Sequence, residues 1–346
     1  MKFNIAFIGF GVVGQGLAEI LVEQEKQLKK NYDFNFKVVA ISDVLKGSVY
    51  DENGLDLEEI LKLVNETGKI NEYPSGIKGW DSLKTITDTN ANIILEVAWT
   101  DLKTGEPAIS HVKTAIKNKK HVVLTNKGPI ALAVHELLDL AKQNNVEMRY
   151  EGTVLSGTPA LNLGLHNLAG VGITKAKGIV NGTTNYILTE MEKGLDYEDA
   201  LKQAQELGYA EADPTADVEG YDALGKIVIL ANTVMGAKLS KDEPPCEGIT
   251  KITVDDIAKA KEEGYRWKLI AGAEIKDDGS VEAYVRPEKI PLEHPLANIM
   301  GPTNALTYTT KYLGDITIVG PGAGKAPTGF ALLTDILDIN RILTKS

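Results

Sequence analysis

Cysteine is almost absent from this chain: Cys246 is the only one in 346 residues. A single thiol cannot form an intramolecular disulfide, which suits a reducing compartment. No apolar run approaches the roughly 20 residues of a membrane-spanning helix. The first residues lead directly into a predicted strand, without the basic flank or cleavage site of a signal peptide. From these absences we expect a cytoplasmic protein that does not act on membranes.

Positive charge and closely spaced metal ligands are also scarce. The chain holds 37 Lys and Arg against 48 Asp and Glu, a formal net charge of −11. Nucleic acids and anionic membranes attract clustered Lys and Arg, so we expect neither as a partner. No two of the five histidines have metal-ligand spacing, so a catalytic zinc is not expected. His111 and His135 are predicted to be partly exposed on helices.

The N-terminal part of the chain alternates short β-rich runs with helical patterns. The length of the whole chain, 346 residues, predicts two domains. The alternation predicts an α/β fold with a Rossmann-type parallel sheet wound on both faces. The predicted strands are Phe3–Ile8, Phe36–Ser42, Ala91–Ala98 and Lys120–Thr125. The polar segment Val44–Asp88 interrupts this pattern and is interpreted as an insertion carrying one helix, Leu57–Asn65. We expect a dinucleotide-binding domain over residues 1–150.

After Glu151 the pattern changes to glycine-rich turns, longer helices and paired strands. Two strands are predicted about the turn Asp277–Ser280, and further strands in 305–324. This predicts an α+β catalytic and dimerisation domain over residues 151–319. A closing helix, Thr328–Leu337, is expected to fold back so that 320–346 completes the first domain. The β runs 281–287 and 305–310 could pair between subunits of a homodimer.

A glycine turn follows the first predicted strand, in the sequence GFGVVGQG. In such a turn Gly9 permits the tight bend, Gly11 lets a phosphate approach the backbone, and Gly14 lets the helix pack on the strand. The N–H groups of Val12 and Val13 are then offered to a pyrophosphate at the helix N-terminus. This spacing predicts a bound dinucleotide, although a strand-to-helix turn without a ligand has the same pattern.

The residues after the second predicted strand bear on the choice between NAD and NADP. Asp43 stands where a carboxylate would accept a hydrogen bond from a ribose hydroxyl and repel a 2′-phosphate. Lys46 follows three residues later and would act in the opposite sense. Since no arginine lies near, the sequence favours NAD and leaves NADP open.

The segment Glu206–Lys226 concentrates acidic residues before an apolar helix. Asp222 and Lys226 are four residues apart, so on a helix they share a face and can pair. Asp217 is predicted to cap that helix. An exposed ion pair would stabilise little, but Lys226 begins an almost wholly apolar run, and burying a lysine is costly unless it has a function. A solvated acidic turn and a functional site both remain open at this point.

Two further polar groups stand at predicted strand ends. Asn126 and Lys127 follow a parallel strand, where open α/β sheets present ligand-binding groups. Gly182, Thr183 and Thr184 mark a strand-to-helix break. The lysines and carboxylates together suit reduction of a carbonyl in a substrate that carries an ammonium group. A lysine can protonate the alkoxide that hydride transfer creates, and carboxylates can hold the ammonium.

The chain resembles the homoserine dehydrogenase family over nearly its whole length. The resemblance rests on GFGVVGQG, VVLTNKGPIAL, YEGTVLSGTPAL, GIVNGTTNYIL, HPLANIMGPTNAL, GPGAGKAPTGFALL and above all GYAEADPTADVEGYDALGK. It implies interconversion of L-homoserine and L-aspartate 4-semialdehyde with NAD or NADP, in threonine and methionine biosynthesis. It implies Lys226 as the proton-transfer residue and Lys127 close to substrate and nicotinamide. The implied substrate-binding residues are Glu211, Asp222, Thr183, Tyr209 and Asp217, and the implied further cofactor contacts are Thr100, Gly182 and Gly324.

The resemblance also implies at least a dimer and a monovalent cation such as sodium. The cation would be held by the backbone carbonyls of Glu151, Val154, Ser156 and Thr158. The chain resembles a short form, without an aspartate kinase or a C-terminal regulatory module. Trp99 stands where many members have a smaller residue. Two alternatives remain open: a dehydrogenase for another amino acid, and a cofactor-sensing protein whose acidic cluster is only structural.

Overall fold

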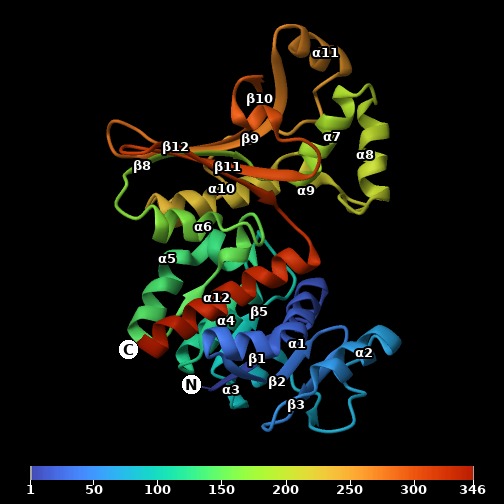
Figure 1. The fold of residues 1–346 in the computed structure, drawn as a ribbon, viewed down its shortest axis with the longest axis vertical. Coiled ribbons are helices and arrows are strands. Elements are labelled where there is room, and N and C mark those ends of the chain that lie inside the picture. The colour runs from blue at the N-terminus through green and yellow to red at the C-terminus, as the bar shows by residue number, and fades with distance from the viewer. Residues whose placement is uncertain (1, 346) are drawn as a thin grey trace. The chain divides into compact units, whose positions relative to one another are not determined.

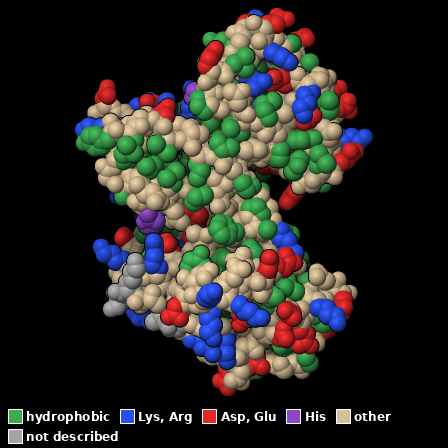
Figure 2. Space-filling view, in the orientation of Figure 1, with side chains coloured by type: hydrophobic (Ala, Val, Ile, Leu, Met, Phe, Trp, Pro, Cys, Tyr) green, Lys and Arg blue, Asp and Glu red, His purple; other side chains and the backbone are tan. Residues whose placement is uncertain are grey.

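The computed structural model describes residues 2–345 and divides into two compact units (Figure 1). The first unit comprises Met1–Gly157 and Gly324–Ser346, and the second comprises Thr158–Ala323. The changes of unit fall a few residues beyond the domain limits of 150 and 320 proposed from the sequence. On the face seen in Figure 2, acidic and basic side chains are interspersed over each unit. No helix within residues 2–345 is long and apolar enough to cross a membrane.

The first unit is built on a seven-stranded, mostly parallel sheet, which confirms the predicted Rossmann-type fold. Its strand order is β4-β3-β2-β1-β5-β6-β7, and β2, β1, β5, β6 and β7 run parallel. The strands are β1 (Lys2–Ile8), β2 (Asn35–Asp43), β3 (Gly47–Tyr50), β4 (Ile77–Lys78), β5 (Ile93–Glu96), β6 (His121–Leu124) and β7 (Met148–Arg149). The two short strands β3 and β4 extend the sheet antiparallel beyond β2.

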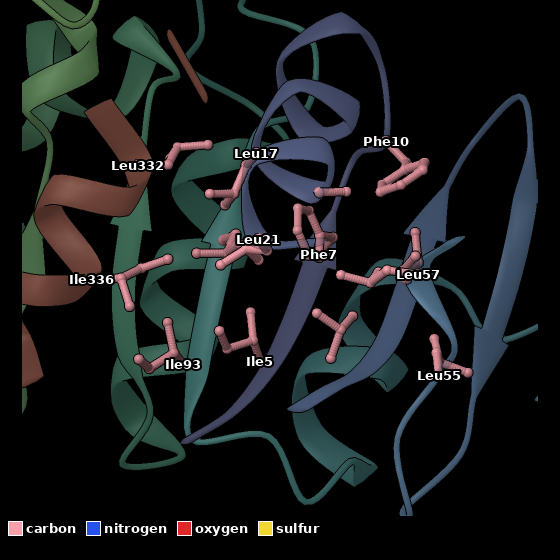
Figure 3. Packing of buried hydrophobic residues seen from close by; sticks show 14 of the residues in the cluster. Ile5, Phe7, Phe10, Leu17, Leu21, Leu55, Leu57, Ile93, Leu332 and Ile336 are labelled. Carbon is pink, nitrogen blue, oxygen red and sulfur yellow. The ribbon is translucent and has the colours of Figure 1, made fainter. Parts of the chain in front are cut away.

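Helices cover both faces of this sheet. They are α1 (Val12–Tyr32), α2 (Leu57–Thr67), α3 (Ser82–Asp88), α4 (Ala108–Lys117), α5 (Lys127–Asn144) and α12 (Lys325–Lys345). Alternate residues of a strand point to opposite faces. Ile5 and Phe7 of β1 therefore pack with Leu17 and Leu21 of α1 (Figure 3). Leu332 and Ile336 of α12 join the same core.

The closing helix is longer than predicted and returns to the first unit, as expected. It lies beside α1 (Figure 1). A Cβ atom on Gly16 of α1 would lie 2.3 Å from the carbonyl oxygen of Lys325. A Cβ on Gly329 of α12 would lie 2.6 Å from the backbone of Gly16. Glycine at both positions lets the two helix backbones approach closely, and this fixes the C-terminal segment to the first unit.

The insertion after β2 contains more structure than the sequence predicted. The expected helix is present as α2, begun by Asp56, whose side chain accepts a hydrogen bond from the Glu59 N–H. The prediction of a single helix is wrong, because β3, β4 and α3 are also present. The strands are short and lie at the sheet edge, where the pairing of β3 with β2 and of β4 with β3 depends on backbone hydrogen bonds rather than on an apolar run. Polar residues concealed them from pattern analysis.

The second unit is built on a five-stranded antiparallel sheet of order β10-β9-β8-β11-β12. Its strands are β8 (Ile173–Ile179), β9 (Tyr265–Ile275), β10 (Val281–Pro291), β11 (Thr303–Thr310) and β12 (Gly314–Pro321). The predicted hairpin about Asp277–Ser280 is confirmed. Its helices are α6 (Ala160–Asn162), α7 (Gly182–Glu192), α8 (Tyr197–Glu206), α9 (Thr215–Val218), α10 (Tyr221–Val234) and α11 (Val254–Glu262). Helix α10 lies along the sheet and contacts β9 and β10 (Figure 1).

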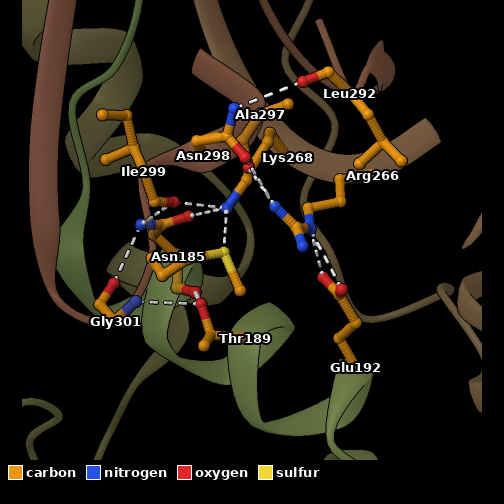
Figure 4. Close-up of polar contacts among 11 residues, drawn as sticks. Asn185, Thr189, Glu192, Arg266, Lys268, Leu292, Ala297, Asn298, Ile299 and Gly301 are labelled. Carbon is orange, nitrogen blue, oxygen red and sulfur yellow. Dashed lines mark hydrogen bonds and ion pairs between the residues drawn. The ribbon is translucent and has the colours of Figure 1, made fainter. Parts of the chain in front are cut away.

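A buried lysine fixes the turn that precedes β11 (Figure 4). Lys268 of β9 is 1% exposed, and its Nζ donates to Asn185 Oδ1 at 2.9 Å and to the Ile299 carbonyl. The Asn185 amide group in turn donates to the carbonyls of Ile299, Gly301 and Thr303. Burial lowers the pKa of Lys268 to about 8. These hydrogen bonds hold the first turns of α7 against the turn that precedes β11.

Candidate active site

The glycine turn between β1 and α1 has the geometry of a phosphate cradle. Gly9 has φ of +93°, and a Cβ there would lie 2.6 Å from the Val97 carbonyl oxygen. A Cβ on Gly14 would lie 3.2 Å from the Gly9 oxygen, whereas one on Gly11 would meet no heavy atom within 4 Å. The N–H groups at the start of α1, including those of Val12 and Val13, have no intrahelical acceptor. The turn is closed at its first and third glycines and open at its second, which fits a pyrophosphate.

Asp43 connects this turn to the loop after β2. Its Oδ2 accepts a hydrogen bond from the Phe10 N–H at 2.7 Å. Its Oδ1 accepts from the N–H groups of Leu45 and Lys46, each at 2.9 Å. A carboxylate offers about four acceptor sites, so these three bonds leave room for one more, such as a ribose hydroxyl. Asp43 therefore shapes the turn in addition to its predicted contact with a cofactor.

A cavity of about 610 Å³ opens beside Asp43. Its wall combines the end of β2 with side chains of the insertion, among them Ser48, Asn71, Lys78 and Trp80. The Trp80 ring stacks on Tyr50 with centroids 5.1 Å apart. The insertion thus forms one wall of a cavity at the carboxyl end of β2, and open α/β sheets bind ligands at the carboxyl ends of their strands.

His111 is buried, so the prediction that it is partly exposed is wrong. It is 5% exposed, and its Nδ1 lies 2.6 Å from Oε2 of the fully buried Glu96 at the end of β5. Glu96 Oε1 also accepts a hydrogen bond from the Ala98 N–H at 3.0 Å. The helical spacing around His111 did not reveal its burial, because the partner that buries it lies on a strand 15 residues earlier.

Asn126 links this buried pair to the start of α5, where Lys127 is the first helical residue. The Asn126 amide group donates to the carbonyls of Ala98 and Trp99, and its Oδ1 accepts from the Gly128 N–H. Helix α5 is interrupted at Ala133, where the backbone is non-helical. The half-buried Thr100 and the 78% exposed Trp99 lie in the loop so fixed.

In the second unit, the predicted pair of Asp222 and Lys226 is present on α10. Lys226 Nζ lies 2.6 Å from Asp222 Oδ2 and also donates to the Val180 carbonyl at 2.7 Å. Lys226 is 8% exposed, as its place before an apolar run predicted. An ammonium has three N–H donors, and these two contacts leave one for a substrate oxygen.

Asp217 does not cap α10, contrary to prediction. The residue at the N-cap is Gly220, with φ of +84° and no side-chain bond to the helix. Asp217 lies in α9 instead, and its Oδ1 accepts a hydrogen bond of 2.6 Å from Nδ2 of Asn181. The same nitrogen donates to Asp222 Oδ2 at 2.9 Å. Burial and the nearby Asp222 raise the pKa of Asp217.

Sequence reasoning missed Asn181, which joins the two acidic residues. It precedes Gly182 and caps α7, with its Oδ1 accepting from the Thr184 N–H at 2.9 Å. The available signal was an asparagine at a predicted strand-to-helix break, since asparagine is a preferred N-cap residue. Its second role could not be seen, because Asp217 and Asp222 are 36 and 41 residues away in sequence.

The other substrate-binding residues implied by the resemblance are Thr183, Tyr209 and Glu211, and they differ in burial. Thr183 is buried, and its Oγ1 donates to the Tyr209 carbonyl at 2.6 Å. Tyr209 is exposed and packs on Tyr186. Glu211 is exposed, and its carbonyl accepts a hydrogen bond from Gln205. The structure thus joins Thr183 to Tyr209, whereas the role of the Glu211 carboxylate stays a prediction.

The remaining predicted positions are glycines and backbone carbonyls. A Cβ on Gly182 would lie 2.6 Å from the Pro302 oxygen, so only glycine fits there. Gly324 has φ of +126°, which also requires glycine. Among the four carbonyls predicted to bind a cation, that of Glu151 accepts from Val154 and that of Thr158 accepts from Ala160. Ser156 contributes a hydroxyl bond to Thr328. The cation site stays a prediction.

Residues 159–337 match the family model described as homoserine dehydrogenase, and residues 2–123 match one described as glutamate/leucine/phenylalanine/valine dehydrogenase. The chain is 45% identical over 344 residues to an NAD(+)-dependent homoserine dehydrogenase of Pseudomonas canavaninivorans, covering 99% of this chain and 98% of the relative. It is 44% identical over 337 residues to a homoserine dehydrogenase of Methanocaldococcus jannaschii, covering 97% and 98%.

Solved structures agree with these relatives. A homoserine dehydrogenase of Thiobacillus denitrificans superimposes with a TM-score of 0.86 at 31% identity, covering 100% of this chain and 75% of the other. A hyperthermophilic archaeal homoserine dehydrogenase in complex with NADPH superimposes with a TM-score of 0.85 at 30% identity, covering 99% and 98%. Together with the acidic cluster, the buried lysine and the glycine turn, these matches show that the chain belongs to the homoserine dehydrogenase family.

Proposed function

We propose that this protein interconverts L-homoserine and L-aspartate 4-semialdehyde with NAD or NADP, a reaction of threonine and methionine biosynthesis. The observation that carries the proposal is the buried Lys226, paired at 2.6 Å with Asp222. This chain belongs to the homoserine dehydrogenase family, and its glycine turn fits a pyrophosphate. We place the activity in the cytoplasm, where a lone thiol such as Cys246 stays reduced.

The proposed cofactor contacts lie in the first unit. The open side of Gly11 and the N–H groups of Val12 and Val13 would receive the pyrophosphate, and Asp43 would accept a bond from a ribose hydroxyl. When bound, the nicotinamide ring accepts or returns a hydride. Asp43 favours NAD, because a 2′-phosphate would meet its carboxylate. The relative from Pseudomonas canavaninivorans, described as NAD(+)-dependent, supports the same preference.

Lys226 is proposed to move the proton. In the oxidation, the hydroxyl-bearing carbon loses a hydride, its C=O bond forms, and the hydroxyl proton passes to neutral Lys226 Nζ. In the reduction, the Lys226 ammonium donates that proton back as the hydride reaches the carbon. Asp217 and Asp222 would attract the substrate ammonium. Lys127, Thr183, Tyr209 and Glu211 are proposed as further contacts of the substrate, and Thr100, Gly182 and Gly324 of the cofactor.

The test is a kinetic comparison of the purified chain with L-homoserine and each oxidised cofactor, following the near-ultraviolet absorbance of the reduced nicotinamide. The proposal expects turnover with at least one cofactor. Turnover with another amino alcohol but not with homoserine would support a different amino-acid dehydrogenase. Cofactor binding without turnover on any amino alcohol would support a cofactor-sensing protein.

We further propose a homodimer formed through the sheet of the second unit. Of the two runs predicted to pair between subunits, 281–287 lie in β10 at one edge of that sheet, whereas 305–310 lie in β11, which is already paired on both sides by β8 and β12. Strand β12 forms the other edge, and its Val319 is 51% exposed. An edge strand offers unpaired backbone groups to a second chain. Light scattering after size exclusion should give twice the chain mass of 37.4 kDa. The variant Val319→Asp should shift the population toward one chain, and a wild-type mass of a single chain would overturn the proposal.

A further inference from the structure

Both the nitrogen and the oxygen of the Asn181 side-chain amide are hydrogen-bonded beside the two acidic residues Asp217 and Asp222. Asn181 is 4% exposed. Its Oδ1 accepts from both the N–H and the Oγ1 of Thr184, each at 2.9 Å. Its Nδ2 donates to Asp217 Oδ1 at 2.6 Å and to Asp222 Oδ2 at 2.9 Å. A carboxamide nitrogen has two hydrogens, so each carboxylate receives one of them.

The partners of Asn181 also fix which end of its amide faces which way. A backbone N–H needs an acceptor, so the oxygen must point at α7. Two carboxylates need donors, so the nitrogen must point at Asp217 and Asp222. The asparagine therefore stands between the N-terminus of α7 and two negative groups that come from α9 and α10.

Two half-buried carboxylates held this close repel each other unless donors or cations separate them. Lys226 contacts Asp222 directly, at the same oxygen that Asn181 contacts. Asp217 is faced by Asp222 and Lys226 of α10 and by Asn181 and Thr183 at the start of α7. Asn181 bonds to both acids and ties them to the N-terminal end of α7.

We propose that Asn181 is a positioning residue that keeps Asp217 and Asp222 as an ionised pair, aimed together at a cationic group of the substrate. Through Asp222 it also holds the lysine that transfers the proton. The substrate class follows from this geometry: a small carbonyl or alcohol compound that carries an ammonium group. This reading of the substrate rests on the proposed function, whereas the effect on the carboxylates does not.

The electrostatic consequence has a definite sign. Burial and Asp222 raise the pKa of Asp217, and the hydrogen bond from Asn181 lowers it. Removing that bond should raise the pKa further, so Asp217 becomes neutral at a higher pH. A neutral acid attracts an ammonium weakly, so the acidic limb of kcat/KM for homoserine should move to higher pH.

The capping role of Asn181 allows variants that preserve the helix. Serine and aspartate are both good N-cap residues, so Asn181→Ser and Asn181→Asp keep an acceptor for α7 and lose both amide donors. Asp196 provides the matched control. It caps α8 through a bond from the Asp199 N–H and is exposed, so Asp196→Ser changes a cap of the same unit without touching the cluster.

The experiment combines kinetics with carbon-13 NMR of labelled aspartate carboxyls, assigned with Asp217→Asn. In Asn181→Ser we expect a higher Asp217 pKa and kcat/KM for homoserine lowered about 10- to 100-fold, as for lost hydrogen bonds to charged groups. The acidic limb should move upward in pH, and the affinity for NAD should stay within about twofold. Asn181→Asp should move the acidic limb further, and Asp196→Ser should resemble wild type.

The outcomes separate this proposal from the proposed function. An unshifted Asp217 pKa in both Asn181 variants overturns the positioning role, whether or not homoserine is the substrate. A raised Asp217 pKa in the Asn181 variants, together with a wild type that does not oxidise homoserine, supports the electrostatic role and removes the proposed function. Lowered kcat/KM with an unmoved pH profile shows only a structural cap and contradicts the proposal.

Discussion

Glu96 and His111 form a buried pair at the carboxyl end of the parallel sheet, with His111 Nδ1 2.6 Å from Glu96 Oε2. Through the Ala98 N–H and the Asn126 side chain, Glu96 also orders the loop after β5 and the first turn of α5. That loop carries Thr100, and that turn begins with Lys127. Two predicted functional residues are thus fixed by a pair that has no predicted role in the chemistry.

Replacing His111 by alanine should therefore destabilise the first unit. Removing His111 leaves Oε2 of the buried Glu96 without its partner, and breaking a buried pair in this way costs about 3–5 kcal/mol. Chemical denaturation should show the lower free energy of unfolding. A cofactor titration should show weaker NAD binding. Lys113→Ala is the control on the same helix, because the half-buried Lys113 forms an ion pair with the exposed Glu136 that is worth less than about 1 kcal/mol. A His111→Ala protein as stable as wild type would contradict the role of the pair.

The glycine turn predicts opposite results at two of its positions. Gly11→Ala should fold normally, because its Cβ meets no heavy atom and the backbone there is extended, but NAD affinity should fall about tenfold or more. Gly9→Ala should be destabilised, because φ is +93° and its Cβ would approach Val97. Melting temperature and NADH fluorescence titration measure the two effects. Full affinity in Gly11→Ala would place the pyrophosphate elsewhere.

Asp43 should control both turn geometry and cofactor choice. Asp43→Asn loses the negative charge and disturbs the acceptor pattern for Phe10, Leu45 and Lys46. We expect kcat/KM with NAD to fall and the ratio of NAD to NADP efficiency to fall with it, since a 2′-phosphate is no longer repelled. Kinetics with both cofactors measure this ratio. An unchanged ratio would mean that other groups, such as Lys78 in the adjoining cavity, set the preference.

Lys268 predicts how stability changes in alkaline solution. Its pKa is lowered from 10.5 to about 8 by burial, so the unfolded chain binds more protons than the native one between these values. Stability from this group is therefore least below pH 8 and rises toward pH 10.5, by about 3 kcal/mol in total.

The free energy of unfolding of wild type minus that of Lys268→Met should increase across this window. Subtraction removes the contribution of other groups, including the buried Lys120, whose pKa is also lowered to about 8. The lost bonds to Asn185 and Ile299 should add to this difference an amount that does not depend on pH. A difference that stays constant from pH 7 to pH 11 would refute the prediction.

The sequence predicted those features that depend on local pattern. The glycine turn, the β9–β10 hairpin and the Asp222–Lys226 pair each involve residues close in the chain, so periodicity and spacing specify them. The strands of the insertion, the burial of His111 and the bridge from Asn181 to Asp217 depend on contacts between distant segments. Asp217 was predicted to cap a helix because capping rules consider only neighbouring residues. They cannot predict that Asp217 accepts a hydrogen bond from Asn181, which lies 36 residues away in the chain.

The central claim is that Lys226 transfers the proton in homoserine oxidation. Steady-state oxidation of L-homoserine by Lys226→Met, beside wild type and with NAD affinity measured separately, tests it most directly. Methionine suits the buried helical position of Lys226, so folding should survive. We predict kcat lowered at least about 100-fold, with NAD affinity within about twofold. A kcat close to that of wild type would remove Lys226 from the reaction and contradict the account.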